Sequence, residues 1–507
     1  MPILNARSCT LGSKPSGPLN ATEVGLRDSI TSQILFSSII IICIYEDFFK
    51  FKPTGFKTQK CVKNSSSILQ NETILHVGMD DTDSPKGMCT TFLCYEIVKF
   101  LEKQEIEFMD FPHLIRFNPN IPWKTRGNGA VRLTIRTKNP KKIKNKIIQF
   151  VANYSDTKNG ANPGVVFFQN KEIPPSFEKF SNLALWKLIG RKQAKQFVSE
   201  NNIESFYLGN GQGLIGAISA VGYKFSDHTF ELLSYRKKSQ FGKKRGINLD
   251  SVKKMQSILP DTFSSYDNES DRVLITPHGP DPVFYGIRGE TVKSVVSAST
   301  IVNTNEKLDG YMVFKSNQGT GDHLKNELQI SDLKPFTSGF LVGEVCNKPI
   351  TKQGGHVFFS IRVKEKNIRC AVYKPTKITH VAQDLIVGDK IQIGGGIRKA
   401  SKKHGRVLNV EFLRVLQLVK HRLSANPNCR KCNKRMKSKG INQGFECIKC
   451  GKSSISKTIL EMPRKIQCKL YIPSVSAHRH LTRPYQRIKK RNKNIRFNDS
   501  VPLIHIF

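Results

Sequence analysis

The pattern of apolar and polar positions predicts a strand, a loop and a helix where the chain first becomes regularly patterned. Residues 74–79, ILHVGM, form a short apolar run typical of a buried strand. In residues 90–104 apolar side chains recur every three or four positions, which predicts a helix. Thr90 or Thr91 is the expected cap of that helix. Residues 131–136 then alternate between apolar and polar side chains, which predicts a half-buried strand.

The same pattern divides the remaining chain into two parts. Residues 203–225 read as a strand, a glycine-rich turn and a helix, and residues 266–291 as loops with short strands. This irregular alternation favours an α/β or α+β fold. Residues 337–418 contain several short alternating strands and a basic loop, GGGIRKASKKHG, at 394–405. They predict a small barrel of the oligonucleotide-binding (OB) type.

One apolar run lies near the N-terminus, at Ile34–Tyr45. It is too short to cross a bilayer, which takes about 20 residues. Asp28 precedes it and no clear cleavage site follows, which argues against a secretion signal. We therefore interpret residues 1–72 as an extension, with a mis-chosen start codon as its simplest origin, and expect no membrane association. A signal or anchor is the alternative.

The charge of the chain indicates a polyanionic partner. A length of 507 residues predicts about three or four domains. The formal net charge is +41, from 81 Lys and Arg against 40 Asp and Glu. Residues 421–507 hold 21 Lys and Arg against three acids, a net charge of 21 − 3 = +18. Such an excess favours nucleic acid as the partner, and a merely solvated basic surface is the alternative.

Four of the 12 cysteines have the spacing of a metal site. They form two CxxC pairs, separated by fourteen residues, at Cys429, Cys432, Cys447 and Cys450. Four thiolates at this spacing predict a structural zinc ribbon, with two redox pairs as the alternative. The other cysteines are scattered, which is not a disulfide framework and favours a reducing cytoplasm.

The glycines at Gly211, Gly213 and Gly216 match the GxGxxG pattern between a predicted strand and a helix. The pattern occurs in dinucleotide-binding folds, but the chain does not continue as repeated βαβ units. A tight turn that approaches a phosphate is therefore the preferred interpretation. The chain has no Walker A sequence, so any use of ATP requires another architecture.

The candidate catalytic loop is GMDDTDSPKGMCTT, at residues 78–91. Its acidic residues are Asp80, Asp81 and Asp83. Carboxylates in this arrangement suit magnesium, and the helix that follows directs free N–H groups at the same place. Lys86, and Lys124 and Arg126 from the next loop, add positive charge. This combination fits phosphoryl transfer, whereas an acidic turn that caps a helix is the alternative.

Five motifs, in this order along the chain, closely resemble the archaeal tRNA(Ile) 2-agmatinylcytidine synthetases, the TiaS family. They are GMDDTDSPKGMCTT, LIRFNPNIPWKTRGNGAV (114–131), GNGQGLIGAISAVG (209–222), TPHGPDPVFYGIRGE (276–290) and AHRHLTRPYQR (477–487). The resemblance runs from about Ile74 to Arg487, so the N-terminal extension falls outside it.

The resemblance implies a multidomain α/β and α+β architecture. The expected parts are an ATP-dependent kinase-like α/β domain (73–195), a ferredoxin-like domain (196–332), an OB-fold domain (336–420), a zinc ribbon (425–456) and a basic tRNA-binding tail (457–507). The matched part of that tail is expected to pack near the ribbon and to contact tRNA.

The resemblance also implies a reaction. ATP activates the carbonyl oxygen at carbon 2 of the wobble cytidine in isoleucine tRNA with the anticodon CAU. The amine of agmatine then displaces the phosphate, and ATP ends as AMP with two phosphates released. The modified base pairs with A, so AUA is read as isoleucine. The implied cofactors are ATP, magnesium and zinc, and no obligate protein partner is expected.

The site residues follow from the matched motifs. Asp80, Asp81 and Asp83 are the expected magnesium-binding and catalytic residues, and Thr90 matches a threonine that becomes phosphorylated. The expected ATP-binding residues are Lys86, Gly87, Lys124, Arg126, Gly127 and Asn128. The agmatine candidates are Asp267, His278, Asp281 and Arg288. For Asp267 and Asp281 a structural turn residue is the alternative.

Two other hypotheses remain at this stage. One is a tRNA-binding protein with an inactive nucleotide site, and the presence of every expected carboxylate and of Thr90 argues against it. The other is a small-molecule kinase, which does not explain the basic C-terminal segment. A related amine in place of agmatine also stays open.

Overall fold

The computed structural model describes residues 72–402, 405–492 and 503–507. The predicted N-terminal extension, including the apolar run at Ile34–Tyr45, lies outside these ranges except for Glu72. Within the described ranges no helix has the length and apolarity needed to cross a membrane.

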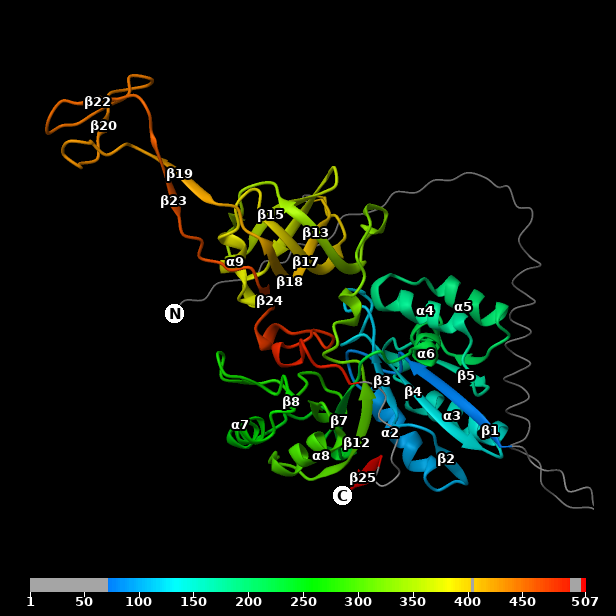
Figure 1. Ribbon diagram of the computed structural model, residues 1–507. Helices are drawn as coiled ribbons and strands as arrows, with labels where there is room; N and C mark the ends of the chain where they lie inside the picture. The colour runs from blue at the N-terminus through cyan, green and yellow to red at the C-terminus, as the bar shows by residue number, and fades with distance from the viewer. Residues whose placement is uncertain (1–71, 403–404, 493–502) are drawn as a thin grey trace, which may run out of the picture. The chain divides into compact units, whose positions relative to one another are not determined.

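The described residues form an 11-stranded mixed sheet that continues through both regions expected to be separate domains (Figure 1). The two halves meet where β3 and β12 pair in parallel, with Lys315 opposite His113. The order of neighbouring strands in the sheet is β6 (Glu204–Tyr207), β5 (Gly164–Gln169), β1 (Thr73–Asp80), β4 (Gly129–Thr137), β3 (His113–Arg116), β12 (Leu308–Ser316), β7 (Thr229–Arg236), β11 (Val283–Gly289) and β8 (Thr262–Phe263). Two further strands, β2 (Ile106–Phe108) and β25 (Ile504–Ile506), pair with β4 and β12.

The two faces of the sheet carry different cores because the strand side chains alternate. One core packs β1 residues such as Leu75 and Val77 against α2, α3, α7 and α8. The opposite core packs Ala130 and Val166 against α4, α5 and α6, which lie together in Figure 1. The helices are α2 (Thr90–Leu101), α3 (Pro140–Tyr154), α4 (Pro175–Trp186), α5 (Arg191–Glu200), α6 (Gly213–Gly222), α7 (Leu249–Ile258) and α8 (Val292–Ile301).

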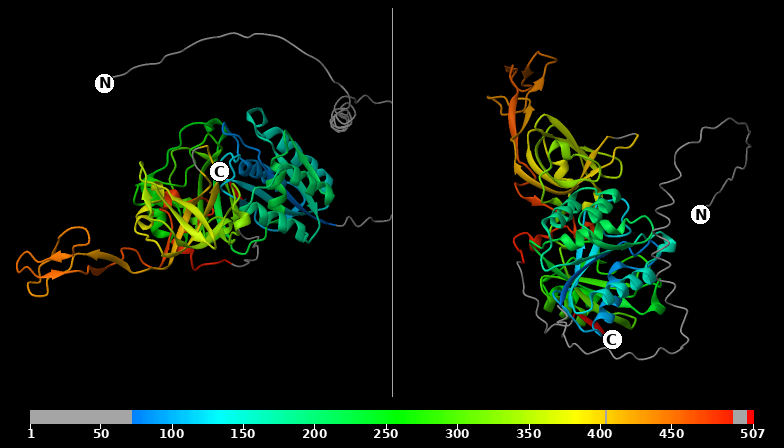
Figure 2. Two further views of the ribbon diagram at one scale, coloured as in Figure 1. Left: turned by 90° about the horizontal axis from the view of Figure 1, so that it is seen from above. Right: turned by 90° about the vertical axis from the view of Figure 1, so that its right-hand side faces the viewer.

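The predicted barrel is present as a closed ring of five strands in the described part of the chain (Figures 1 and 2). Parallel pairing of β16 with β18 and antiparallel pairing of β13 with β15 close the ring. Residues 394–398 of the predicted basic loop belong to β17 instead, so the loop itself is shorter than expected. The strands are β13 (Ser338–Val345), β15 (Val357–Val363), β16 (Lys366–Val372), β17 (Lys390–Arg398) and β18 (Val407–Gln417), with the short β14 (Ile350–Thr351) and helix α9 (Thr379–Gln383) beside them.

Beyond the barrel, the antiparallel pair β19 (His421–Ala425) and β23 (Thr458–Met462) leads to and from the cysteine-containing segment. That segment contains β20 (Lys437–Ser438), β21 (Phe445–Glu446) and β22 (Ser453–Ser454). The chain then returns to the barrel, where β24 (Leu470–Tyr471) pairs with β18. A small hairpin of β9 (Tyr266–Asp267) and β10 (Arg272–Val273) completes the strands.

The C-terminal tail does not pack near the ribbon as predicted. Arg487 is fully buried among Asp227, Glu290 and the carbonyl of Gly319, all of which belong to the sheet half that contains β7 and β11. Arg483 also pairs with Asp227. The matched tail is therefore part of the core. Its arginines form ion pairs with buried carboxylates, which would be costly to leave unpaired inside the protein.

Candidate active site

The end of β1 and the start of α2 face a cavity of about 710 Å³. Its wall also includes the loop after β3, part of α6, and strands β7 and β11. The predicted site residues that line it are Asp80, Asp81, Asp83, Thr90, Lys124, Arg126, Gly127, Asn128, Asp281 and Arg288. Segments that are far apart in the sequence thus supply one site.

The three aspartates are held by different contacts. The backbone N–H of Asp81 donates to Oδ1 of Asp80 at 2.7 Å, and Asp81 itself has a left-handed backbone with φ 58°. Oδ2 of Asp81 is buried and has no hydrogen-bond partner among the described residues. Asp83 accepts from Nη1 of Arg126 at 2.5 Å. A buried carboxylate oxygen without a donor is the feature expected where a cation or a substrate group completes the site.

Burial raises the pKa of all three carboxyl groups. It raises the pKa of Asp80 well above its usual value, and the neighbouring Asp81 adds to the effect. The pKa of Asp81 rises to about 7, from burial and then from the charge of Asp83. The pKa of Asp83 rises only to about 6, because Arg126 opposes the effect of burial. Carboxylates crowded in this way favour a positive charge among them.

The N-terminus of α2 places Thr90 beside the acidic loop, but Thr90 is not the helix cap. Cys89 occupies the cap position, with an extended backbone and no capping hydrogen bond from its side chain. Thr90 already belongs to the helix, and its hydroxyl accepts from Thr82 at 3.0 Å. The prediction that Thr90 or Thr91 caps α2 was therefore wrong. The buried Thr90 hydroxyl lies in the wall of the cavity instead.

Arg126 connects the second loop to the first. Besides Asp83, its guanidinium donates to the carbonyls of Met88 and Ser84, at 3.0 and 3.2 Å. Its Nε lies 3.6 Å from Oδ2 of Asp281, a buried residue that also pairs with Arg245. One cation therefore holds the acidic loop and the 276–290 segment in a fixed relation.

Four predicted residues do not line this cavity. Lys86 and Gly87 lie in a tight turn closed by hydrogen bonds between Ser84 and Gly87, and Lys86 is exposed. The carboxylate of Asp267 accepts from Ser270 within its own turn, at 2.7 Å. His278 is exposed, contacts Arg272 and lines a second cavity.

The GxGxxG glycines permit α6 to pack closely against the end of β1. A β-carbon at position 216 would lie 1.9 Å from Oδ2 of Asp80, and one at position 213 would lie 2.6 Å from the carbonyl oxygen of Asp80. The motif therefore brings a helix against the acidic loop, a role that the pattern alone did not distinguish from nucleotide binding.

Replacing Gly216 by Ala should displace the Asp80 carboxylate and lower the rate of catalysis about tenfold or more. Gly405→Ala is the matched control, because a β-carbon at position 405 would meet no atom within 4 Å. Steady-state turnover and thermal unfolding of both variants provide the measurement. Equal activity of the two variants would show that α6 does not position Asp80.

Sequence reasoning missed several buried groups in the same wall. Glu231 on β7 is 2% exposed, and it contacts Arg288 at 3.2 Å and Arg116 at 3.7 Å. The side chain of Gln318 donates to Glu231 and contacts Nδ1 of His480 at 2.9 Å. A lone carboxylate in the otherwise apolar strand TFELL was the available signal for Glu231, because such residues are rarely buried unpaired.

A second cavity of about 600 Å³ adjoins the first, and the two share ten lining residues, which include Arg126, Arg288 and His480. Its described lining contains no carboxylate. The basic lining residues are Arg116, Lys124, Arg126, Arg272, Arg288 and Arg479, together with the histidines His278, His478 and His480. This composition suits an anionic ligand and disfavours a dication.

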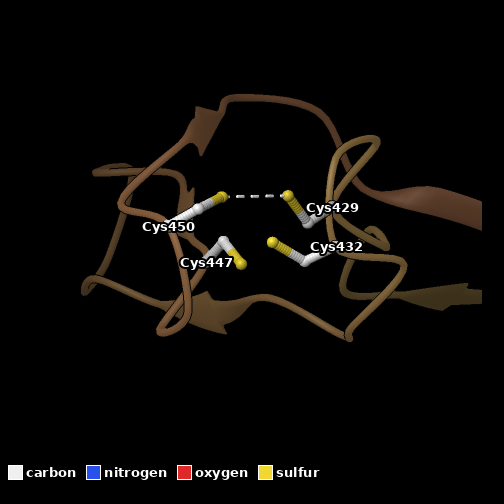
Figure 3. Close-up of side chains that lie close together, drawn as sticks. All are labelled: Cys429, Cys432, Cys447 and Cys450. Atoms are coloured by element: carbon white, nitrogen blue, oxygen red, sulfur yellow. Dashed lines mark hydrogen bonds between the residues drawn. The ribbon is translucent and has the colours of Figure 1, made fainter.

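The four predicted cysteines come together as a compact cluster (Figure 3). Their sulfur atoms all lie within 4.8 Å of one another, and those of Cys429 and Cys450 are 3.5 Å apart. Zn–S bonds of about 2.3 Å put the sulfurs of a tetrahedral site about 3.8 Å apart, so the cluster fits zinc. Among the described residues, it is the one group of three or more Cys, His, Asp or Glu side chains whose ligand atoms lie close enough together to hold a metal ion.

Comparison with known proteins gives the same assignment along the chain. Residues 76–210 match the TiaS TCKD domain, residues 211–323 the TiaS FLD domain, and residues 426–466 the TiaS C-terminal zinc ribbon domain. The tRNA(Ile) 2-agmatinylcytidine synthetase TiaS of Cenarchaeum symbiosum is 46% identical over 435 residues, which cover 86% of this chain and 97% of the relative. The chain belongs to the TiaS family.

Other TiaS proteins agree with this assignment. The Thermococcus sibiricus enzyme is 37% identical over 426 residues, which cover 83% of this chain and 97% of the relative. A complex of TiaS with its isoleucine tRNA and ATP superposes with a TM-score of 0.75 at 33% identity, over 84% of this chain and 100% of that chain. A complex of TiaS with the same tRNA, AMPCPP and agmatine gives 0.73 at 31% identity, over 84% and 100%.

Proposed function

We propose that this chain is a tRNA(Ile) 2-agmatinylcytidine synthetase. It uses ATP to activate the carbon-2 carbonyl of the wobble cytidine in isoleucine tRNA with the anticodon CAU, and it attaches agmatine there. The observation that carries the proposal is the meeting of the acidic cavity, which contains Thr90, four aspartates and Glu231, with a basic cavity whose described lining has no carboxylate. TiaS relatives form complexes with isoleucine tRNA, ATP and agmatine, which supports each substrate. We place the reaction in the cytoplasm, where tRNA is used.

The chemistry follows from the poor leaving ability of a pyrimidine carbonyl oxygen. Phosphorylation from ATP converts that oxygen into part of a phosphate, and the amine nitrogen of agmatine then forms the bond to carbon 2 as the phosphate departs. ATP ends as AMP and two phosphates: one phosphate leaves with the oxygen of carbon 2, and the other takes its additional oxygen from water. The product pairs with A, so AUA codons are read as isoleucine.

Magnesium fits the acidic loop of this chain. Asp80, Asp81 and Asp83 offer hard oxygen donors, and the buried Oδ2 of Asp81 lacks a hydrogen-bond donor among the described residues. Because these carboxylates do not form a closed cage, the ion would share them with water and phosphate oxygens. When bound, it neutralises charge on the ATP phosphates.

The protein groups around the aspartates suit a triphosphate. The N-terminus of α2 directs free N–H groups toward the cavity, and we assign the phosphates to this end together with Lys124, Arg126 and Asn128. Arg126 fixes Asp83, so the carboxylate stays in place while phosphates move. We assign Thr90 as the group that accepts a phosphoryl from ATP, because its hydroxyl lines the same wall. Lys86 and Gly87 would contact ATP only at the turn outside the cavity.

Agmatine carries two positive charges and requires carboxylates. Asp281 is buried in the acidic cavity, and we retain it as the candidate for the guanidinium group. His278 lines the carboxylate-free cavity, and Arg288 lines both cavities, so we reassign these two residues to the tRNA. The Asp267 side chain bonds within its own turn, which favours a structural role.

The proposed domain roles follow the same division. We assign a kinase-like role to residues 73–195 and a ferredoxin-like fold to residues 196–332, although one sheet continues through both. The barrel at 336–420 is assigned as an OB fold, and with the zinc ribbon at 425–456 it supplies a tRNA-binding surface. In the assigned tail, 457–507, the arginines that pair with Asp227 and Glu290 hold the core together.

A labelling assay tests the function. Purified protein is incubated with ATP, magnesium, radiolabelled agmatine and a transcript of isoleucine tRNA with the CAU anticodon, and initiator methionine tRNA is the control. Label should enter only the isoleucine tRNA, and AMP should form. Tight tRNA binding without incorporation of label would indicate instead a tRNA-binding protein whose acidic loop only caps a helix.

A further inference from the structure

The acidic and basic cavities meet at a shared wall, and His480 is part of it. The following inference rests on the proposed function. If ATP occupies the acidic cavity and tRNA approaches through the basic one, the reacting base must lie at this shared wall. The side chains of the wall are mostly donors, namely Arg116, Lys124, Arg126 and Arg288. Asn128, Thr276 and His480 can also accept a hydrogen bond there, and the contacts of His480 fix which of its atoms does so.

The tautomer of His480 follows from its neighbours. The carboxylate of Glu231 only accepts hydrogen bonds, so Gln318 must direct its amide nitrogen at Glu231. The amide oxygen of Gln318 then faces Nδ1 of His480 at 2.9 Å, which requires Nδ1 to carry the proton. The contact from Arg288 to the same nitrogen is longer, at 3.3 Å. Nε2 of a neutral His480 consequently carries a free lone pair.

The position of this lone pair is fixed. The N–H of Gly319 donates to the carbonyl of His480 at 2.9 Å, which anchors the backbone. A β-carbon at position 127 would lie 2.4 Å from Nε2, so the imidazole fits only beside a glycine. No described residue hydrogen-bonds to Nε2. Burial, Arg116 and Arg288 hold the pKa of His480 well below its usual value, which keeps the ring neutral.

We propose that Nε2 of His480 accepts a hydrogen bond from the 4-amino group of the wobble cytosine and so selects that base. The Watson–Crick edge of cytosine presents one donor and two acceptors, and Arg116 and Arg288 can donate to the two acceptors. Uracil would turn its carbonyl oxygen toward the Nε2 lone pair, which leaves both groups unpaired. A site of this kind discriminates strongly against the wrong partner.

The test combines two enzymes with two tRNAs. His480→Asn keeps a donor toward Gln318 but has no acceptor at the position of Nε2. The second tRNA carries pyrimidin-2-one, which is cytosine without its 4-amino group, at the wobble position. Removal of the 4-amino group from the base should lower kcat/KM of the native enzyme, and it should lower that of His480→Asn less. We expect the two reductions to differ by a factor of about ten or more. Any change in the intrinsic reactivity of the base is common to both enzymes and cancels in this comparison.

Two further variants make the test decisive. His480→Gln puts an acceptor near the position of Nε2, and should recover much of the discrimination. His478→Ala removes a neighbouring histidine of the basic cavity. In this variant, removal of the 4-amino group should reduce kcat/KM by the same factor as in the native enzyme. If removal of the 4-amino group reduced kcat/KM equally in the native enzyme and in His480→Asn, the inference would be overturned. If the native enzyme did not modify the ordinary cytidine tRNA, the proposed function itself would be wrong.

Discussion

Replacing Asp81 by Asn is expected to lower the kcat of agmatine transfer at least about 100-fold, the size of loss seen when one preorganised electrostatic group is removed. The variant removes a negative charge at Asp81, whose buried Oδ2 has no hydrogen-bond partner among the described residues. Asn has nearly the same size, and it tolerates the left-handed backbone at φ 58° better than Ala would. Single-turnover transfer of labelled agmatine measures the effect.

The affinity for tRNA should remain within about twofold of the native value, because phosphate contacts come from basic groups rather than from this loop. Filter binding at fixed salt concentration measures it. Asp250→Asn makes the same charge change at an exposed position in α7, outside both cavities, and should have native turnover. Equal losses of turnover and of tRNA affinity in Asp81→Asn would mean that the loop has a structural role.

Arg487→Met should be strongly destabilising, with a loss of about 3–5 kcal/mol in the free energy of unfolding. The Arg487 side chain is fully buried, and it bonds Asp227 at 3.0 Å and Glu290 at 2.8 Å. Removal of the guanidinium leaves Glu290 without its ion-pair partner inside the protein. Chemical denaturation followed by far-UV circular dichroism measures the change.

Arg422→Met is the control, because this arginine is exposed on β19 and surface substitutions usually change stability by less than about 0.5 kcal/mol. Unfolding of Arg487→Met at the native denaturant midpoint would mean that the tail is not part of the cooperative core. Activity should fall together with stability, because the same tail carries His480 into the shared wall.

Local patterns predicted the local parts of the site well. The apolar run, the acidic loop and the helix at residues 74–101 are all present, because periodicity within ten or twenty residues reports directly on burial. The two CxxC pairs converge as expected, since the ligand spacing of a zinc ribbon lies within a short segment. The cap of α2 was assigned wrongly because Cys89 is an unusual residue for that position.

The features that the sequence did not indicate are contacts between distant segments. Nothing in the periodicity of β3 and β12 indicates that they pair across some 200 residues and join two expected domains into one sheet. The hydrogen-bonded chain of Glu231, Gln318 and His480 likewise depends on tertiary contacts. The basic tail was expected to pack near the ribbon and to contact tRNA, but its arginines pair with acids that only the folded core brings together.

The return of the chain from the ribbon to the core has a consequence for synthesis on the ribosome. His480, Arg487 and β25 follow the zinc ribbon in the chain, and the described part of the core contains their partners. The strands and helices before the ribbon can fold as they emerge, but the shared wall cannot assemble until His480 has left the exit tunnel. A nascent chain that has emerged only as far as the ribbon therefore lacks the shared wall, and a premature stop codon directly after the ribbon should yield an inactive protein rather than one of reduced activity.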